Sequence, residues 1–141
     1  MQNDFLEIQA DDEGWLKLGV AAELAKKYNA DQRDFMQSLA LLLEGVLPNE
    51  TQCAQRGGWF AKKTLYRVIV TLGENRYTLE DPGQGMLQAS RTRIVRGIAL
   101  KTEPLPIEEW IAELSAVIDE RAKTSQKARE ALSRLVGSSA I

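Results

Sequence analysis

Residues 64–72 read Thr-Leu-Tyr-Arg-Val-Ile-Val-Thr-Leu, and this stretch decides the fold class. Its apolar side chains recur at every second position, at Tyr66, Val68, Val70 and Leu72. Arg67 and Thr71 occupy positions between them. Because successive side chains of a strand point to opposite faces, the alternation predicts a β-strand with one face in the core.

Turn signals place this strand in a sheet that we predict over about residues 51–101. Gly73-Glu74-Asn75 predicts a tight turn, and residues 81–85 predict another, because proline fixes φ and glycine allows positive φ. The predicted strands are residues 51–56, 64–72, 76–80, 86–90 and 93–101, of which the last two could form one long, bent strand. We therefore expect an antiparallel sheet of about four or five strands.

Apolar residues at helical spacing predict helices before and after the sheet. The predicted helices cover about residues 15–29, 31–47 and 107–136, with a weaker pattern over residues 120–126. The second helix is the most apolar and should lie deepest on the sheet. We expect a single α+β domain over residues 1–141, with N-terminal and C-terminal amphipathic helices against the sheet and loosely ordered ends at residues 1–13 and 137–141.

The amino-acid composition excludes several kinds of catalytic and metal-binding site. The chain of 141 residues has no histidine, which removes Ser/His and Cys/His nucleophile pairs and histidine-based zinc sites. Nothing in the sequence matches a phosphate-binding loop or a calcium loop. We expect a protein that is not an enzyme and that binds no metal or other cofactor.

Cellular context follows from what the sequence contains. The single cysteine, Cys53, excludes an internal disulfide framework and fits a reducing compartment, where we expect it to act as a small buried apolar residue. The start of the sequence does not have the pattern of a secretory signal. The longest apolar run, Leu39–Leu43, is far shorter than the roughly 20 residues of a membrane span. We expect a cytoplasmic protein with no membrane partner.

Charge is divided unevenly along the chain. Residues 51–101 carry nine basic and three acidic side chains, whereas residues 1–50 carry four basic and ten acidic ones. Such a division can mark a surface for nucleic acid or for an acidic partner, or two elements of one fold that neutralise each other. The overall charge of −2 favours internal neutralisation.

The predicted hairpin tip, residues 56–63, is the most suggestive candidate site. Its aromatic side chains are Trp59 and Phe60, and its basic side chains are Arg56, Lys62 and Lys63. The aromatic pair could stack on bases or press into an acidic partner, with the cations contacting phosphates or carboxylates. Alternatively, the pair folds back over the sheet edge and caps the core, which Gly57 and Gly58 would allow. The sequence favours the second alternative slightly.

Arginines elsewhere in the predicted sheet form a second candidate site, namely Arg67, Arg76, Arg91, Arg93 and Arg96. Alternation places Arg67 and Arg76 on the outward face together with either Arg91 and Arg93 or Arg96. Arg96 shares the parity of Ile94 and Ile98, so it is either released by a bulge or a strand end near Gly97, or partly buried and paired with a carboxylate. A solvated face or salt bridges explain these arginines more simply than a phosphate site does.

The order of helices, strands and helices is similar to that of small bacterial α+β modules such as secretion chaperones, a similarity of layout that does not carry function. From the residues themselves we expect a non-enzymatic protein-binding, adaptor or chaperone-like domain, for which a homodimer is one form. Nucleic-acid binding through the basic sheet and the tip is the alternative. It requires the basic side chains to lie on one open face.

Overall fold

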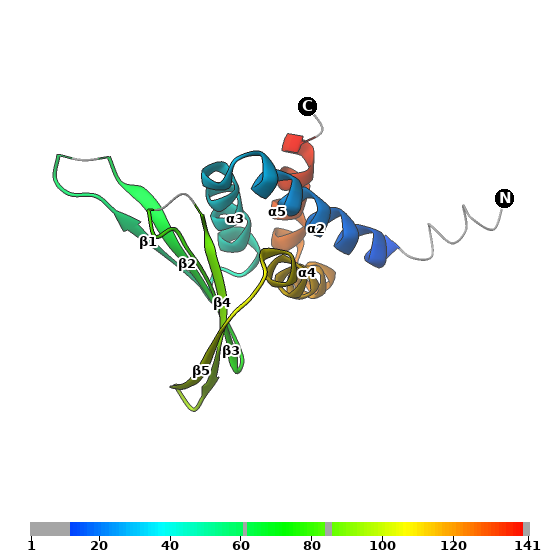
Figure 1. Ribbon diagram of the computed structural model, residues 1–141. Coiled ribbons are helices and arrows are strands. Elements are labelled where there is room, and N and C mark those ends of the chain that lie inside the picture. The colour runs from blue at the N-terminus through cyan, green and yellow to red at the C-terminus, as the bar shows by residue number, and fades with distance from the viewer. Residues whose placement is uncertain (1–11, 61, 84–85, 140–141) are drawn as a thin grey trace, which may run out of the picture.

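The computed structural model describes residues 12–60, 62–83 and 86–139, with the side chains of residues 12–20 and 136–139 left aside. The chain forms a five-stranded antiparallel sheet flanked in sequence by two helices on each side, which confirms the predicted α+β class (Figure 1). The elements are α2 (Asp12–Ala30), α3 (Gln32–Val46), β1 (Thr51–Arg56), β2 (Thr64–Leu72), β3 (Asn75–Glu80), β4 (Gln88–Val95), β5 (Ile98–Pro104), α4 (Ile107–Thr124) and α5 (Gln126–Ser139).

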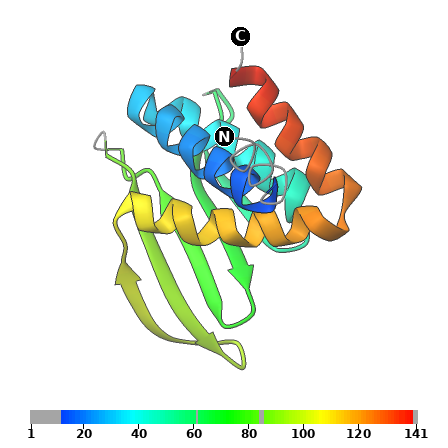
Figure 2. The same cartoon turned by 90° about the vertical axis from the view of Figure 1, so that its right-hand side faces the viewer.

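The strands pair in sequence order as a meander, from β1 at one edge to β5 at the other. The helices lie on one side of the sheet, and no other element covers the opposite side among the described residues (Figures 1 and 2). We call that uncovered side the open face. An antiparallel sheet tolerates this arrangement because alternate side chains separate a buried face from a solvated one.

The core lies between the sheet and the helices. α3 contacts β1 and β2, and α4 contacts β4, whereas α2 and α5 pack mainly on the other helices. Trp110 of α4 is fully buried, and its indole N–H donates to the Ser90 carbonyl oxygen over 3.2 Å. Val68, Val70 and Leu79 meet the helices from the sheet. Fully burying such side chains contributes about 1.5–3 kcal/mol each.

The C-terminal helical pattern is interrupted where its periodicity weakens. Ser125 has an extended backbone that ends α4, and its hydroxyl accepts a hydrogen bond from the Ala128 amide at the start of α5. α5 then continues to Ser139, so residues 137–139 are helical rather than loosely ordered. α2 likewise includes residues 12 and 13. The rest of the predicted loose ends, residues 1–11 and 140–141, lies outside the described residues.

Two register shifts change which side chains face the core. The first lies between Ala54 and Gln55 of β1, opposite Tyr66. Leu65 packs on the core, whereas Tyr66 stays outside it, so the prediction of Tyr66 as a core residue is wrong. The bulge places one extra residue in β2, and Tyr66 therefore joins Arg67 on the open face.

The second register shift, between Arg93 and Ile94, lies at the β4–β5 hairpin. Arg96 is exposed in its turn at φ +53°, as the strand-end alternative predicted. Ile98 and Leu100 are 63% and 61% exposed, so they do not face the core. This second bulge and the hairpin turn release them to solvent.

Candidate functional site

The hairpin tip consists of Arg56–Phe60, Lys62 and Lys63 and joins β1 to β2. Trp59 and Phe60 are 100% and 105% exposed, so the alternative in which they cap the core is wrong. Figure 1 shows this end of the hairpin projecting away from the helices. Each aromatic ring exposes a large apolar area to water, and covering that area is favourable. Adjacent exposed aromatic side chains therefore indicate a surface that binds another molecule.

Gly57 shapes the tip. Its φ is +136°, and a Cβ atom at this position would lie 2.9 Å from the Lys62 carbonyl oxygen and 3.1 Å from the Lys63 Cα. Only glycine allows the two arms of the hairpin to approach this closely. At Gly58, by contrast, an added Cβ atom would meet no other atom within 4 Å. Lys62 and Lys63, on the returning arm of the hairpin, are exposed.

Arg56 connects the tip to the open face. Its guanidinium lies 4.6 Å from the centre of the Tyr66 ring, and its Nη2 donates to the Asp81 carbonyl oxygen over 3.3 Å. The Arg67 guanidinium lies 5.2 Å from the same ring and donates to Glu80 over 2.7 Å. Tyr66 is thus flanked by two cations, a role that we did not predict. Its place between Arg56 and Arg67 could be recognised only once the bulge was known.

Arg76 is a third cation on the open face. It follows Arg67 on the outward side of the neighbouring strand, as the sequence predicted. Its Nε is buried and has no hydrogen-bond partner among the residues that the structure describes. Of the described residues, the strands therefore place three arginines, Arg56, Arg67 and Arg76, on the open face against one carboxylate, Glu80.

Arg91 and Arg93 lie on the helix side of the sheet, because β4 pairs Arg91 with the inward-facing Tyr77. The alternative that placed them on the outward face is wrong. Arg91 donates from Nη1 to both oxygens of Glu113 on α4, over 2.7 and 2.9 Å. Arg93 lies 3.7 Å from Glu74 in an exposed pair. The predicted arginine site is thereby divided between two faces and a turn.

Carboxylates of the sheet and of α4 neutralise much of the basic block. Arg67 pairs with Glu80, Arg93 with Glu74, Lys101 with Glu103 and Arg91 with Glu113. Among the described residues, the ion pair that reaches into residues 1–50 joins Glu50 to Arg121, which lies outside the block. Internal neutralisation therefore occurs, but within the sheet and with α4 rather than with the acidic N-terminal helices.

The two sheet edges are protected against pairing with another strand. The Leu105 amide donates to the Ala89 carbonyl oxygen over 2.9 Å, so the backbone of the preceding residue, Pro104, points outward. Proline has no N–H to offer an added strand, and Lys101 adds a charge to the same edge. The bulge at Ala54 and Gln55 distorts the β1 edge. The edges are therefore poor docking surfaces.

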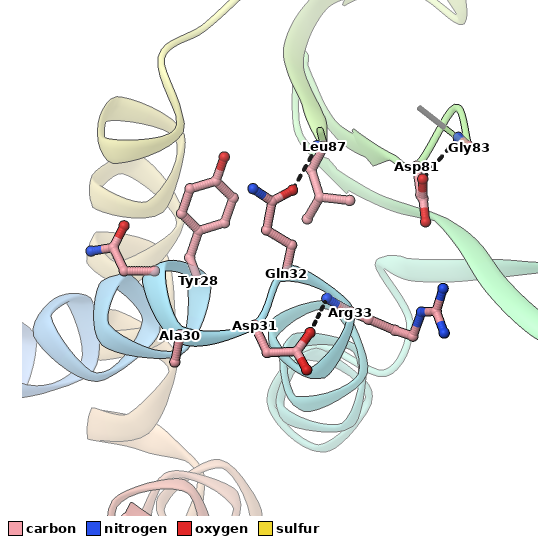
Figure 3. A pocket seen from close by; sticks show the side chains of 9 residues that line it. Tyr28, Ala30, Asp31, Gln32, Arg33, Asp81, Gly83 and Leu87 are labelled. Atoms are coloured by element: carbon pink, nitrogen blue, oxygen red, sulfur yellow. Dashed lines mark hydrogen bonds between the residues drawn. The ribbon is translucent and has the colours of Figure 1, made fainter. Parts of the chain in front are cut away.

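A cavity of about 520 Å³ lies between the α2–α3 corner and the loop after β3 (Figure 3). Its lining includes Tyr28, Asp31, Gln32, Arg33, Asp81 and Leu87. The polar groups serve the loops: Asp31 accepts from the Arg33 amide, Gln32 from the Leu87 amide and Asp81 from the Gly83 amide. The cavity thus contains side chains that are already used to hold the local backbone.

The acidic side chains and the single cysteine were compared with what a metal site or a reactive thiol requires. In the described ranges, no group of three or more acidic, cysteine or histidine side chains could hold a metal ion. Cys53 lies on the exposed edge strand rather than in the core, which corrects its predicted burial. Partial burial of the thiol and a hydrogen bond to Glu44 raise its pKa to about 11. That this protein is not an enzyme remains a prediction.

No helix in the described part of the chain is long and apolar enough to cross a membrane. Comparisons with protein-family models, curated proteins and solved structures found no match for this chain.

Proposed function

We propose that the protein is a non-enzymatic protein-binding or adaptor domain that docks an acidic partner protein on the open face of its sheet. The observation that supports this most directly is the excess of arginine on that face. Arg56 and Arg67 flank the Tyr66 ring, and the neighbouring Arg76 has a buried Nε without an acceptor in the described part of the chain. Arginine and tyrosine are among the residues that dominate protein interfaces.

Charge indicates the kind of partner. Three arginines against one glutamate would repel a second copy of the same face, whereas carboxylates of an acidic partner would complement it. Ile69 lies on the same face beside Arg67 and is half-buried, so the centre of the surface also offers apolar area. A homodimer remains a prediction, but one that must use another surface.

Affinity purification with quantitative mass spectrometry tests this proposal. The baits are the wild-type chain, Arg76→Glu and, as a matched control, Arg134→Glu, which makes the same change of charge on exposed α5. We expect a protein that is enriched by the wild type and the control and lost with Arg76→Glu. The purified partner should then bind by calorimetry, more weakly at high salt. Equal enrichment by all three baits would overturn the proposal.

Nucleic-acid binding is the second candidate, favoured by the exposed aromatics of the hairpin tip beside two lysines. It is weakened by the division of the arginines between two faces, because a strand or duplex needs a continuous basic track. Fluorescence anisotropy of labelled oligonucleotides at ~50 and ~200 mM salt measures it directly. Binding that falls steeply with salt and is lost in Lys62→Glu/Lys63→Glu would support it, and flat titrations would remove it.

A further inference from the structure

Apolar and basic side chains occupy different positions along the hairpin tip. Trp59 and Phe60 are fully exposed at its end, and exposed cations occur within three residues on either side of them, at Arg56, Lys62 and Lys63. No aspartate or glutamate occurs from residue 51 to residue 73. Figure 1 shows that the hairpin carries this end clear of the helices, so the aromatic pair can approach an extended surface.

We infer that the hairpin tip binds the surface of an anionic lipid bilayer. In this arrangement Trp59 and Phe60 enter the interfacial region, while Lys62 and Lys63 contact the negatively charged headgroups. Aromatic rings favour the membrane–water interface, where an apolar body and a wet edge are both accommodated. Lysine and arginine can lay their stems along the apolar layer and keep their charges among the headgroups.

The size of the tip favours a bilayer over a protein. Two aromatic side chains bury about 150–250 Å² each, which together is well below the ~800 Å² that each partner of a standard protein interface contributes. The tip projects from the molecule (Figure 1), and the residues that line the cavity described above belong to other segments. A lipid surface needs no preformed pocket, because its headgroups and acyl chains rearrange around a small insertion.

The earlier expectation of no membrane partner rested on the lack of a spanning segment. Surface attachment through a loop needs no such segment. It also leaves the open face available, so the tip and the proposed protein-binding surface can act independently. Gly57 has a specific role in this arrangement, because it allows the close approach of its backbone to that of Lys62 and Lys63, which narrows the hairpin at the base of the tip.

Vesicle co-sedimentation tests the inference with two kinds of liposome, phosphatidylcholine alone and phosphatidylcholine mixed with phosphatidylglycerol. We expect the wild-type chain to bind the anionic vesicles at least tenfold more tightly and to be released by salt. Trp59→Ala/Phe60→Ala and Lys62→Glu/Lys63→Glu should each reduce binding at least tenfold. Trp59→Phe should retain most of it, because the aromatic character remains.

Matched controls separate the tip from general stickiness. Leu41→Ala removes another exposed apolar side chain, and Lys127→Glu/Arg134→Glu reverses two exposed charges on α5. Both should bind vesicles like the wild type. Emission of Trp59, obtained by subtracting the spectrum of Trp59→Phe, should shift to the blue on anionic vesicles and be quenched by lipids with brominated acyl chains.

Three outcomes would overturn the inference. The first is that the wild-type chain binds neutral and anionic vesicles equally, or binds neither kind. The second is vesicle binding that the tip variants leave intact. The third is that the tip variants lose binding to a purified protein partner or to a single-stranded oligonucleotide but keep binding to vesicles. Arg76→Glu leaves the tip unchanged, so it tests the protein-binding proposal separately. If Arg76→Glu retains partner binding, the protein-binding proposal fails, and the results with the tip variants and vesicles are unaffected.

Discussion

The Nη1 atom of Arg91 lies 2.7 Å from one carboxylate oxygen of Glu113 and 2.9 Å from the other. This contact joins β4 to α4 beneath the sheet. The Tyr77 hydroxyl donates to the same carboxylate over 2.9 Å, so one glutamate holds two strands against the helix. The side chains of Arg91 and Glu113 are 30% and 27% exposed, which limits competition from water.

Removing either charge should leave the other without its partner. In a double-mutant cycle of Arg91→Met and Glu113→Met, measured by urea unfolding, we expect a coupling free energy clearly larger than that of an exposed pair, because Glu113 accepts two hydrogen bonds from Arg91 in a partly buried site. The matched cycle of Arg93→Met and Glu74→Met should give about 0.2–1 kcal/mol, because that pair is separated by 3.7 Å and is about two-thirds exposed. Equal coupling in the two cycles would contradict a special role for Glu113.

Tyr77 should make stability fall at high pH. Burial, then its hydrogen bond to Glu113, raise the pKa of Tyr77 from 10.0 to about 12. Below pH 10 the phenol is neutral in both states, and its contribution is fully present. As the pH rises towards 12, the unfolded chain loses this proton first and unfolding becomes more favourable. Tyr77→Phe should lose stability less steeply in this window, and an unchanged slope would exclude Tyr77 as the cause.

The hairpin tip should depend on Gly57 and not on Gly58. Gly57→Ala forces a Cβ atom to within 2.9 Å of the Lys62 carbonyl oxygen at a φ that other residues rarely adopt. A strained conformation of this kind costs on the order of 1–3 kcal/mol. Amide hydrogen exchange between Arg56 and Thr64 should therefore become faster in Gly57→Ala. Gly58→Ala is the matched control, and equal exchange in both variants would contradict the observed close approach.

The crossing of α3 and α5 should tolerate only one methyl group. A Cβ atom on Gly45 would lie 2.8 Å from the Cβ of Ala131. Gly45→Ala should destabilise the protein by about 1–3 kcal/mol through overpacking, despite the better helix propensity of alanine. Adding Ala131→Gly should recover part of the loss, as measured by urea unfolding. A more stable Gly45→Ala would show that the helices move apart at no cost.

Cys53 should alkylate slowly at neutral pH, because its pKa of about 11 leaves little thiolate there. The rate of reaction with iodoacetamide should rise with pH up to about 11. Glu44→Gln should move this profile to lower pH, since it removes a carboxylate that disfavours the thiolate. A wild-type midpoint near the ordinary value of 9.0 would contradict the influence of burial and Glu44.

Local sequence patterns were sufficient for the class of fold and for most of the elements. The break between the last two strands was predicted at residues 91–92 and is wrong, because β4 continues to Val95 and the turn lies at Arg96 and Gly97. The alternation in residues 64–72 predicted β2, and the turn signals at Gly73 and residues 81–85 separated the following strands. The weak helical pattern over residues 120–126 coincides with the break at Ser125. These features depend on residues close together in the chain, whose spacing alone fixes the direction of each side chain along a helix or strand.

Which side chains gather at a site was decided by tertiary structure. Bulges moved Tyr66 to the open face and exposed Leu100, and the order of strands brought Arg91 beside Tyr77 and under α4. Whether Trp59 and Phe60 pack on the core or point to solvent depends on the packing of distant residues. The local sequence of the tip carries no information about that packing. A strand changes its exposed face with a shift of one residue, so periodicity determines the alternation while long-range packing decides its phase.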